Sequence, residues 1–208
     1  PTEVGSTRAL NMRTPKQLPV LAFALLVGAA PSASRSLLAL SMEGGKQIVD
    51  NARVTVWDVI WPSSGAHGPV PRATSDTVTV ALNDGPTRFV DVLGTEKTIT
   101  RSIGDIRFEP KGAGHREESV GAAVPHDIVI ELKDARVAAL INKSGFPNAF
   151  PRPGSKKILE NERIVAWDFT CTPAVPTPMH FHDKDVVVVY LETGELASTA
   201  PDGQVQNN

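Results

Sequence analysis

From residue 49 onward, the chain is a series of short runs in which apolar and polar residues alternate. The runs are rich in Val, Ile, Thr, Trp and Phe, and Gly, Pro, Asn or Asp separates each run from the next. Alternation with a period of two is typical of half-buried β-strands, and the intervening residues favour turns. The pattern predicts strands at residues 54–60, 77–82, 88–92, 97–102, 106–108 and 127–132. We therefore expect an all-β fold.

The first 34 residues have a different pattern. Arg13 and Lys16 precede an almost wholly apolar run at residues 18–30, and small residues follow at 31–34. A positive start, a short apolar run and a small-residue end are typical of a secretory signal peptide, and the run is too short to span a bilayer comfortably. We predict that residues 1–34 are a signal peptide or a disordered N-terminus, with a periplasmic or secreted mature protein. The alternative for the apolar run is a buried helix.

An internal repeat organises the rest of the chain. Residues 49–59 align with residues 159–169, and residues 69–85 align with residues 178–194 after a one-residue gap. Four identities carry the first alignment: Asn51, Arg53, Trp57 and Asp58 recur as Asn161, Arg163, Trp167 and Asp168. Internal repeats indicate that one structural unit is used more than once. We expect the tryptophans to be core residues, and the Asn and Arg residues to lie at turns and edges.

The repeat predicts two units of unequal length. Residues 35–142 form the first, residues 143–157 hold three prolines and two glycines and are predicted to be a linker, and residues 158–208 form the second. The second unit has room for only about half of the strands of the first. A half-built antiparallel unit leaves an open strand edge. We expect either a truncated unit or one covered by another chain, which predicts a homo-oligomer.

Two histidines of the second unit are candidate metal ligands. His180 and His182 are two residues apart and precede four valines at residues 186–189. In a strand, residues i and i+2 share one face, so both imidazoles can reach one metal ion. The nearest carboxylate, Asp185, has the opposite parity and is expected to point away unless a bulge intervenes.

The second unit resembles the cupin superfamily, and it looks most like the small cupins of the β-alanine-degradation type. The resemblance rests on His180-x-His182-x-x-Asp185, the four valines and Gly194. In the first unit it rests on Gly104-Asp, then Pro110-x4-His115, then residues 128–132. The whole chain therefore looks like a tandem bicupin. The resemblance implies an RmlC-like jelly roll, a double-sheet β-barrel also called a double-stranded β-helix.

The cupin resemblance also implies a metal site of two His and a Glu from a first motif and a His from a second, binding Fe, Mn, Zn or Ni. Each unit holds part of this set. The second unit has His180 and His182, but Val186 stands at the Glu position. The first unit has the second-motif histidine, His115. Its other three ligand positions hold Pro71, Ala73 and Thr77.

The resemblance implies that a small molecule binds in the barrel, with metal-dependent oxidation or isomerisation of a small acid as the implied chemistry. The missing ligands favour the alternative, a metal-free binding or structural protein, and the sequence leaves open whether the chain is an enzyme. The net charge of −2 does not suggest a nucleic-acid surface, and the single Cys171 cannot form an internal disulfide. Charge runs such as residues 116–118 are interpreted as solvated turns.

Overall fold

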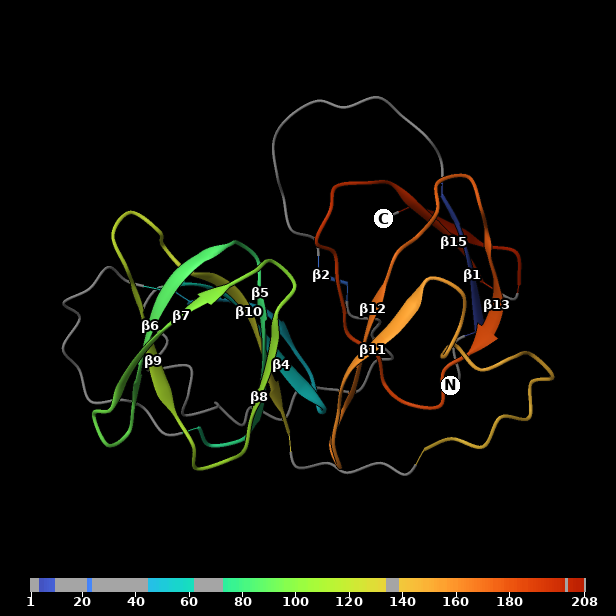
Figure 1. Ribbon diagram of the computed structural model, residues 1–208. Helices are drawn as coiled ribbons and strands as arrows, with labels where there is room; N and C mark the ends of the chain where they lie inside the picture. Colours follow the sequence, from blue (N-terminus) through green and yellow to red (C-terminus); the bar gives the residue numbers. More distant parts are fainter. Residues whose placement is uncertain are drawn as a thin grey trace. The chain divides into compact units, whose positions relative to one another are not determined.

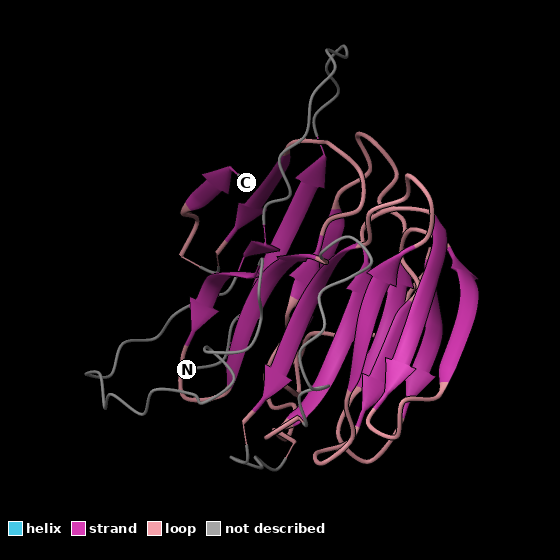
Figure 2. Ribbon diagram, turned by 90° about the vertical axis from the view of Figure 1, so that its left-hand side faces the viewer, coloured by secondary structure: helices cyan, strands magenta, loops and turns pink. Residues whose placement is uncertain are grey.

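The computed structural model describes residues 4–9, 22–23, 45–61, 73–133, 139–200 and 202–207, and none of these is helical (Figure 2). The prediction of an all-β fold is confirmed. In this part of the chain there is no helix of the length and hydrophobicity that a membrane span requires. The chain divides into two compact units (Figure 1). We name Gly28–Arg136 the first-repeat unit, and Pro1–Val27 together with Val137–Asn208 the second-repeat unit.

Two antiparallel sheets form the first-repeat unit, and they face each other (Figure 1). One has the order β3-β4-β10-β5-β8 and the other the order β7-β6-β9. The strands are β3 (Gly45–Asp50), β4 (Val54–Ile60), β5 (Asp76–Ala81), β6 (Gly85–Asp91), β7 (Glu96–Arg101), β8 (Ile106–Glu109), β9 (His115–Ser119) and β10 (His126–Leu132). The predicted strand at residues 54–60 coincides with β4, and the other predicted strands overlap β5 to β8 and β10.

The core of the first-repeat unit lies on the central strands of its larger sheet. Val56, Val59 and Ile128 are almost completely buried, because β4 and β10 have neighbours on both sides. Trp57 is also buried, as expected, and its indole N–H donates to Glu131 Oε2 at 3.1 Å, whereas its counterpart Trp167 is only partly buried. Trp57, Val59 and Val129 form one packed cluster, and Trp61 packs against it.

The second-repeat unit is built from shorter strands. A sheet has the order β13-β1-β15-β16, and two further pairs are β11-β12 and β14-β2. The strands are β1 (Val4–Ala9), β2 (Ala22–Phe23), β11 (Ser155–Glu160), β12 (Val165–Phe169), β13 (Thr177–Phe181), β14 (Val188–Val189), β15 (Leu196–Thr199) and β16 (Val205–Asn207). Two of them, β1 and β2, come from the predicted signal peptide. Signal processing and export stay predictions.

The segment at residues 143–157, predicted as a linker, makes ordered contacts in the second-repeat unit. Ala149 is buried, and its N–H donates to the carbonyl of Phe181 at 2.8 Å. The N–H of Phe181 in turn donates to the carbonyl of Pro147 at 2.8 Å. β11 already begins at Ser155. Proline-rich sequence therefore runs along a strand edge here, a place that tolerates residues without an N–H.

The two units share their hairpin geometry residue by residue. Gly45 pairs with Val59 in β3–β4, and Ser155 pairs with Phe169 in β11–β12, with a register shift at the same point of each ladder. Asn51 Oδ1 accepts from the backbone N–H groups two and three residues ahead, at 2.7 and 2.9 Å. Asn161 Oδ1 does the same at 2.8 and 2.9 Å. The repeated asparagine is thus the turn residue that the sequence predicts.

Candidate functional site

A network of charged side chains fills the interior of the first-repeat unit. Arg101 ends β7, Arg107 lies on β8, Glu117 lies on β9 and Asp127 lies on β10, so four strands contribute. Glu117 and Asp127 are 0% exposed and Arg101 is 5% exposed. Charged residues are buried this deeply only when they are paired. The interior of this barrel is therefore polar, and its charges balance one another.

Each carboxylate of the network contacts at least one cation. Arg101 Nη1 donates to Asp127 Oδ1 at 2.6 Å and lies 3.4 Å from Glu117 Oε2. Arg107 Nη2 donates to Glu117 Oε1. On the far side, Trp61 Nε1 donates to Asp127 Oδ2 at 2.5 Å. Glu117 thus joins two arginines that lie on different strands.

His115 belongs to the same network and is held between two carboxylates. Its Nε2 lies 3.0 Å from Glu117 Oε1, and its Nδ1 lies 2.6 Å from Glu109 Oε1. Burial lowers the pKa of His115, but the contacts with the two carboxylates outweigh burial, so the pKa is raised above 6.5. Arg107 Nη2 also lies 3.0 Å from Nε2, so the imidazole is held by one cationic group and two carboxylates.

Asp127 is the carboxyl group with the most perturbed protonation. Burial and the neighbouring charge of Glu117 raise its pKa to about 6, against the lowering effect of Arg101. The pKa of Glu117 itself is lowered, because its contacts with His115 and Arg107 outweigh the effect of burial. The two carboxyl groups therefore differ in protonation at mildly acidic pH, and Asp127 is the one that takes up a proton first.

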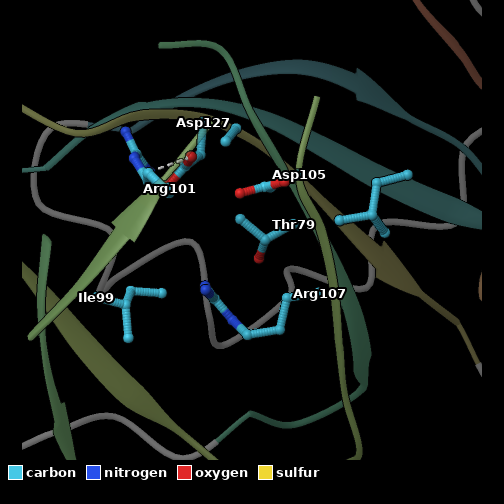
Figure 3. Close-up of a pocket in the computed structure, with 8 residues that line it drawn as sticks. Thr79, Ile99, Arg101, Asp105, Arg107 and Asp127 are labelled. Carbon is cyan, nitrogen blue, oxygen red and sulfur yellow. Dashed lines mark hydrogen bonds and ion pairs between the residues drawn. The ribbon is translucent and has the colours of Figure 1, made fainter. Parts of the chain in front are cut away.

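A cavity of about 270 Å³ opens beside this network (Figure 3). Its polar lining comes from Thr79, Arg101, Asp105, Arg107 and Asp127, and its apolar lining comes from Ala81, Ile99 and Ile106. Figure 3 shows Arg101 joined to Asp127 at one side and Arg107 at another, with Thr79 and Asp105 between. The volume lies just below the range typical of ligand pockets, which suits a small molecule.

In the second-repeat unit the two predicted ligands are brought together. His180 on β13 is buried, and its Nε2 lies 3.1 Å from Nε2 of His182. Nδ1 of His180 lies 2.8 Å from the carbonyl oxygen of Pro178, so this nitrogen carries the proton and Nε2 faces His182. Two ligand nitrogens on a tetrahedral Zn²⁺ are about 3.3 Å apart. The separation therefore matches that of two ligands of one ion.

The rest of that environment does not fit a metal ion. Arg152 Nη1 lies 3.5 Å from both ring nitrogens of His180, which brings a positive charge to the pair. Burial, His180 and Arg152 lower the pKa of His182 to about 4, so its imidazole is neutral, as a metal ligand must be, and the misfit lies in the other ligands. Asp185 is exposed, and no group of three or more His, Cys, Asp or Glu able to hold a metal occurs among the described residues. A stable site needs three or four protein ligands.

The predicted ligands thus fall into two separate groups. His180 and His182 lie together in the second-repeat unit, whereas His115 lies in the first-repeat unit. Of the positions that replace ligands in the first unit, Ala73 and Thr77 are described and Pro71 lies outside the described residues. The metal assignment of the three histidines stays a prediction.

The interpretation of residues 116–118 as a solvated turn is wrong. These residues lie within β9, and Glu117 and Glu118 are both buried. Arg101 and Asp127 were also missed. Each of these two residues stands at the end or the start of a strongly β-like run. Charged residues at such places usually belong to exposed turns, so the sequence does not show that they are buried.

No protein-family model matches the chain, and no curated protein sequence does either. Among solved structures, the chain is similar to a cupin domain from Bordetella pertussis Tohama I, at 26% identity over 43% of this chain and 91% of that one, with a TM-score of 0.38. For an RmlC-like cupin family protein from Methanocaldococcus jannaschii the identity is 12%, the coverages are 42% and 77%, and the TM-score is 0.35. For DMSP lyase DddQ from Ruegeria pomeroyi DSS-3 the identity is 17%, the match covers 52% of this chain and 57% of that one, and the TM-score is 0.35.

The strand order of the first-repeat unit defines the fold independently of those similarities. Strands that are distant in sequence, such as β4 and β10, pair in one sheet, while β6 pairs with β7 and β9 in the other. Two facing antiparallel sheets with this order form a jelly roll. The chain therefore has an all-β, double-stranded β-helix fold, in one barrel unit and a partial second.

Proposed function

We propose that the first-repeat unit binds a small acid in its barrel without a metal ion. The proposal rests on Arg107, which lines the cavity and has a guanidinium nitrogen available to a ligand. Its side chain is 32% exposed and lines the cavity, and its Nη1 has no hydrogen bond to any described residue. A guanidinium with free N–H donors at a cavity wall is suited to a carboxylate.

The remaining contacts of Arg107 hold it in place for this role. Nη2 donates to Glu117, and Nε lies 3.3 Å from Glu109 Oε1. The guanidinium also lies over the ring of Phe89, with Cζ 4.3 Å from the ring centre. A side chain fixed on three sides loses little further conformational freedom when a ligand binds. Thr79 adds a hydroxyl to the same cavity, which suits a polar group of the ligand.

The protonation of Asp127 makes the proposed binding depend on pH. Asp127 lines the same cavity, and its pKa is raised to about 6 by burial and by Glu117. Below that pH the carboxyl group is neutral and does not repel a bound carboxylate. Above it, the carboxylate repels the ligand. Binding of a small acid is therefore expected to weaken as the pH rises through 6.

Calorimetric titration of the purified chain with short carboxylic acids tests the proposal, with glycolate, lactate, malonate and β-alanine as probes. The informative variant is Arg107→Lys, which keeps a positive charge beside Glu117 but lacks Nη1. We expect it to weaken binding roughly tenfold, the effect of losing a charge-assisted hydrogen bond. Arg88→Lys is the matched control, since Arg88 does not line the cavity. Failure of all four acids to bind, or equal binding by Arg107→Lys, would refute the proposal.

Metal-dependent chemistry in the second-repeat unit is the second candidate. The 3.1 Å separation of the His180 and His182 ring nitrogens favours it. A bound divalent ion would act there as a Lewis acid. Because the described residues supply two ligands and a nearby arginine, we derive no reaction from this pair. Titration with Zn²⁺ tests it directly: binding that His182→Ala abolishes would support the site, and binding that the variant leaves unchanged would exclude it.

A further inference from the structure

The second-repeat unit uses an N-terminal strand where the first-repeat unit uses β9. In the first-repeat unit, β6 lies between β7 and β9. In the second-repeat unit, β15 lies between β16 and β1. The repeat aligns residues 69–85 with residues 178–194, an offset of 109 positions. Arg88 pairs with Thr98 in β6–β7, and the residues 109 positions later, Ala197 and Asn207, pair in β15–β16. β15 and β16 are therefore the counterparts of β6 and β7. β1 therefore takes the position of β9.

The correspondence between β1 and β9 holds at the level of single residues. Glu117 pairs with Phe89 in the first-repeat unit, and Thr7 pairs with Ser198, the counterpart of Phe89, in the second. The same register puts Gly5 at the position of His115. Gly5 is also the partner of His180 across the other edge of β1.

A second N-terminal strand, β2, takes the position of β10 in the same way. In the first-repeat unit β10 pairs with β5, with Val129 opposite Thr79. In the second-repeat unit β2 pairs with β14, and Phe23 lies opposite Val188, which is the counterpart of Thr79. β1 and β2 also follow each other along the chain in the same order as β9 and β10. Two independent pairings thus give one arrangement.

We propose that β1 and β2 are closing strands of the second-repeat unit, at the positions that β9 and β10 take in the first-repeat unit. The slot between β13 and β15 is then a strand-acceptor site, and its occupant is Val4–Ala9 of the same chain. Addition of a strand satisfies two rows of backbone hydrogen-bonding groups that are costly to leave open. Because glycine has no side chain, Gly5 contributes no ligand at the position of His115.

As closing strands, β1 and β2 have a role that a cleaved signal peptide could not have. β2 (Ala22–Phe23) lies within the apolar run at residues 18–30, which is predicted to be part of the signal peptide. If residues 1–34 are removed, both closing strands are lost and the edges of β13 and β15 are exposed. Removal of residues 1–34 and retention of β1 and β2 therefore predict different purified proteins, and one experiment distinguishes them.

A cross-strand disulfide tests the position of β1 in the full-length chain. Thr7 and Ser198 are paired across β1 and β15, and paired Cα atoms in an antiparallel ladder are about 4.5 to 5.5 Å apart, within reach of a disulfide. We propose the double substitution Thr7→Cys and Ser198→Cys in a Cys171→Ser background. After mild oxidation, the intact mass should fall by about 2 Da as the disulfide forms.

The matched control places one cysteine a single residue away. Arg8 pairs with Ala197, so Arg8→Cys combined with Ser198→Cys puts the two thiols on opposite faces of the sheet. Closure within one chain for the first pair and little closure for the control would support the proposal. Equal closure of both pairs, closure of neither, a disulfide that joins two chains, or a purified protein that has lost residues 4–23 would overturn it.

Discussion

The charge of Glu117 can be removed with almost no change in shape by the substitution Glu117→Gln. Glu117 is fully buried and contacts Arg101, Arg107 and His115. Glutamine keeps the volume and one carbonyl oxygen, so the variant tests charge and not packing. Three cationic side chains would lose their shared partner at once, although Asp127 and Glu109 would still contact Arg101 and His115.

The expected cost follows from the burial of the network. Removing one partner of a buried ion pair destabilises a protein by about 3 to 5 kcal/mol, because the opposite charge stays buried without compensation. The remaining carboxylates offset part of this, so we expect about 3 kcal/mol for Glu117→Gln. With a urea dependence of about 2 kcal/mol per M, the unfolding midpoint should fall by about 1.5 M.

Urea unfolding followed by tryptophan fluorescence measures this change, since Trp57 and Trp61 both lie in the first-repeat unit. Glu96→Gln is the matched control: Glu96 is 60% exposed and its nearest cation, Arg88, is 3.7 Å away and 40% exposed. An exposed ion pair contributes about 0 to 1 kcal/mol. If Glu117→Gln costs no more than Glu96→Gln, then the buried network does not stabilise the barrel and the reasoning fails.

Three further predictions concern pH, the repeated turn and metal removal. The raised pKa of His115 gives stability that is complete below pH 6.5 and lost as the pH rises through the folded-state pKa, and the lowered pKa of Glu117 gives stability that is lost as the pH falls below 4.5. The raised pKa of Asp127 adds a loss of stability as the pH rises from 3.8 to about 6. The free energy of unfolding should therefore be highest at mildly acidic pH, near 4.5, and fall toward neutral pH, and a maximum above pH 7 would contradict this. Asn51→Ala and Asn161→Ala should each cost about 1 kcal/mol in urea unfolding, because each asparagine accepts two backbone hydrogen bonds, and an unchanged midpoint would rule out the turn role. Incubation with a chelator should leave the thermal unfolding of the first-repeat unit unchanged, whereas a drop of several degrees would show that a metal supports it.

The strands could be predicted from sequence because their pattern is local. Residues 54–60 alternate between turn signals and form β4 as expected. The four valines at residues 186–189 show the limit of this approach. Only Val188–Val189 form a strand, and Val186 is 42% exposed. A β-branched run becomes a strand only where another strand pairs with it, and here the short β2 is the partner of β14.

The buried charges could not be predicted because their partners are far apart in the chain. Arg101 contacts Glu117 and Asp127, which lie 16 and 26 residues later on two different strands. Nothing near Arg101 in sequence shows that the two sheets bring these residues together. The same limit applies to β1, whose partners Thr177 to Phe181 and Leu196 to Thr199 are close to the other end of the chain.

Because Trp61 donates a hydrogen bond to Asp127, the fluorescence of Trp61 should report the protonation of Asp127. Indole emission responds to the charge of a group bonded to its N–H, and here that group is the carboxyl whose pKa is about 6. The chain holds three tryptophans, so replacing Trp57 and Trp167 by phenylalanine leaves a single emitter beside the cavity. The midpoint of its fluorescence titration then reports the protonation of Asp127 directly, and its displacement by an added acid reveals binding without any label.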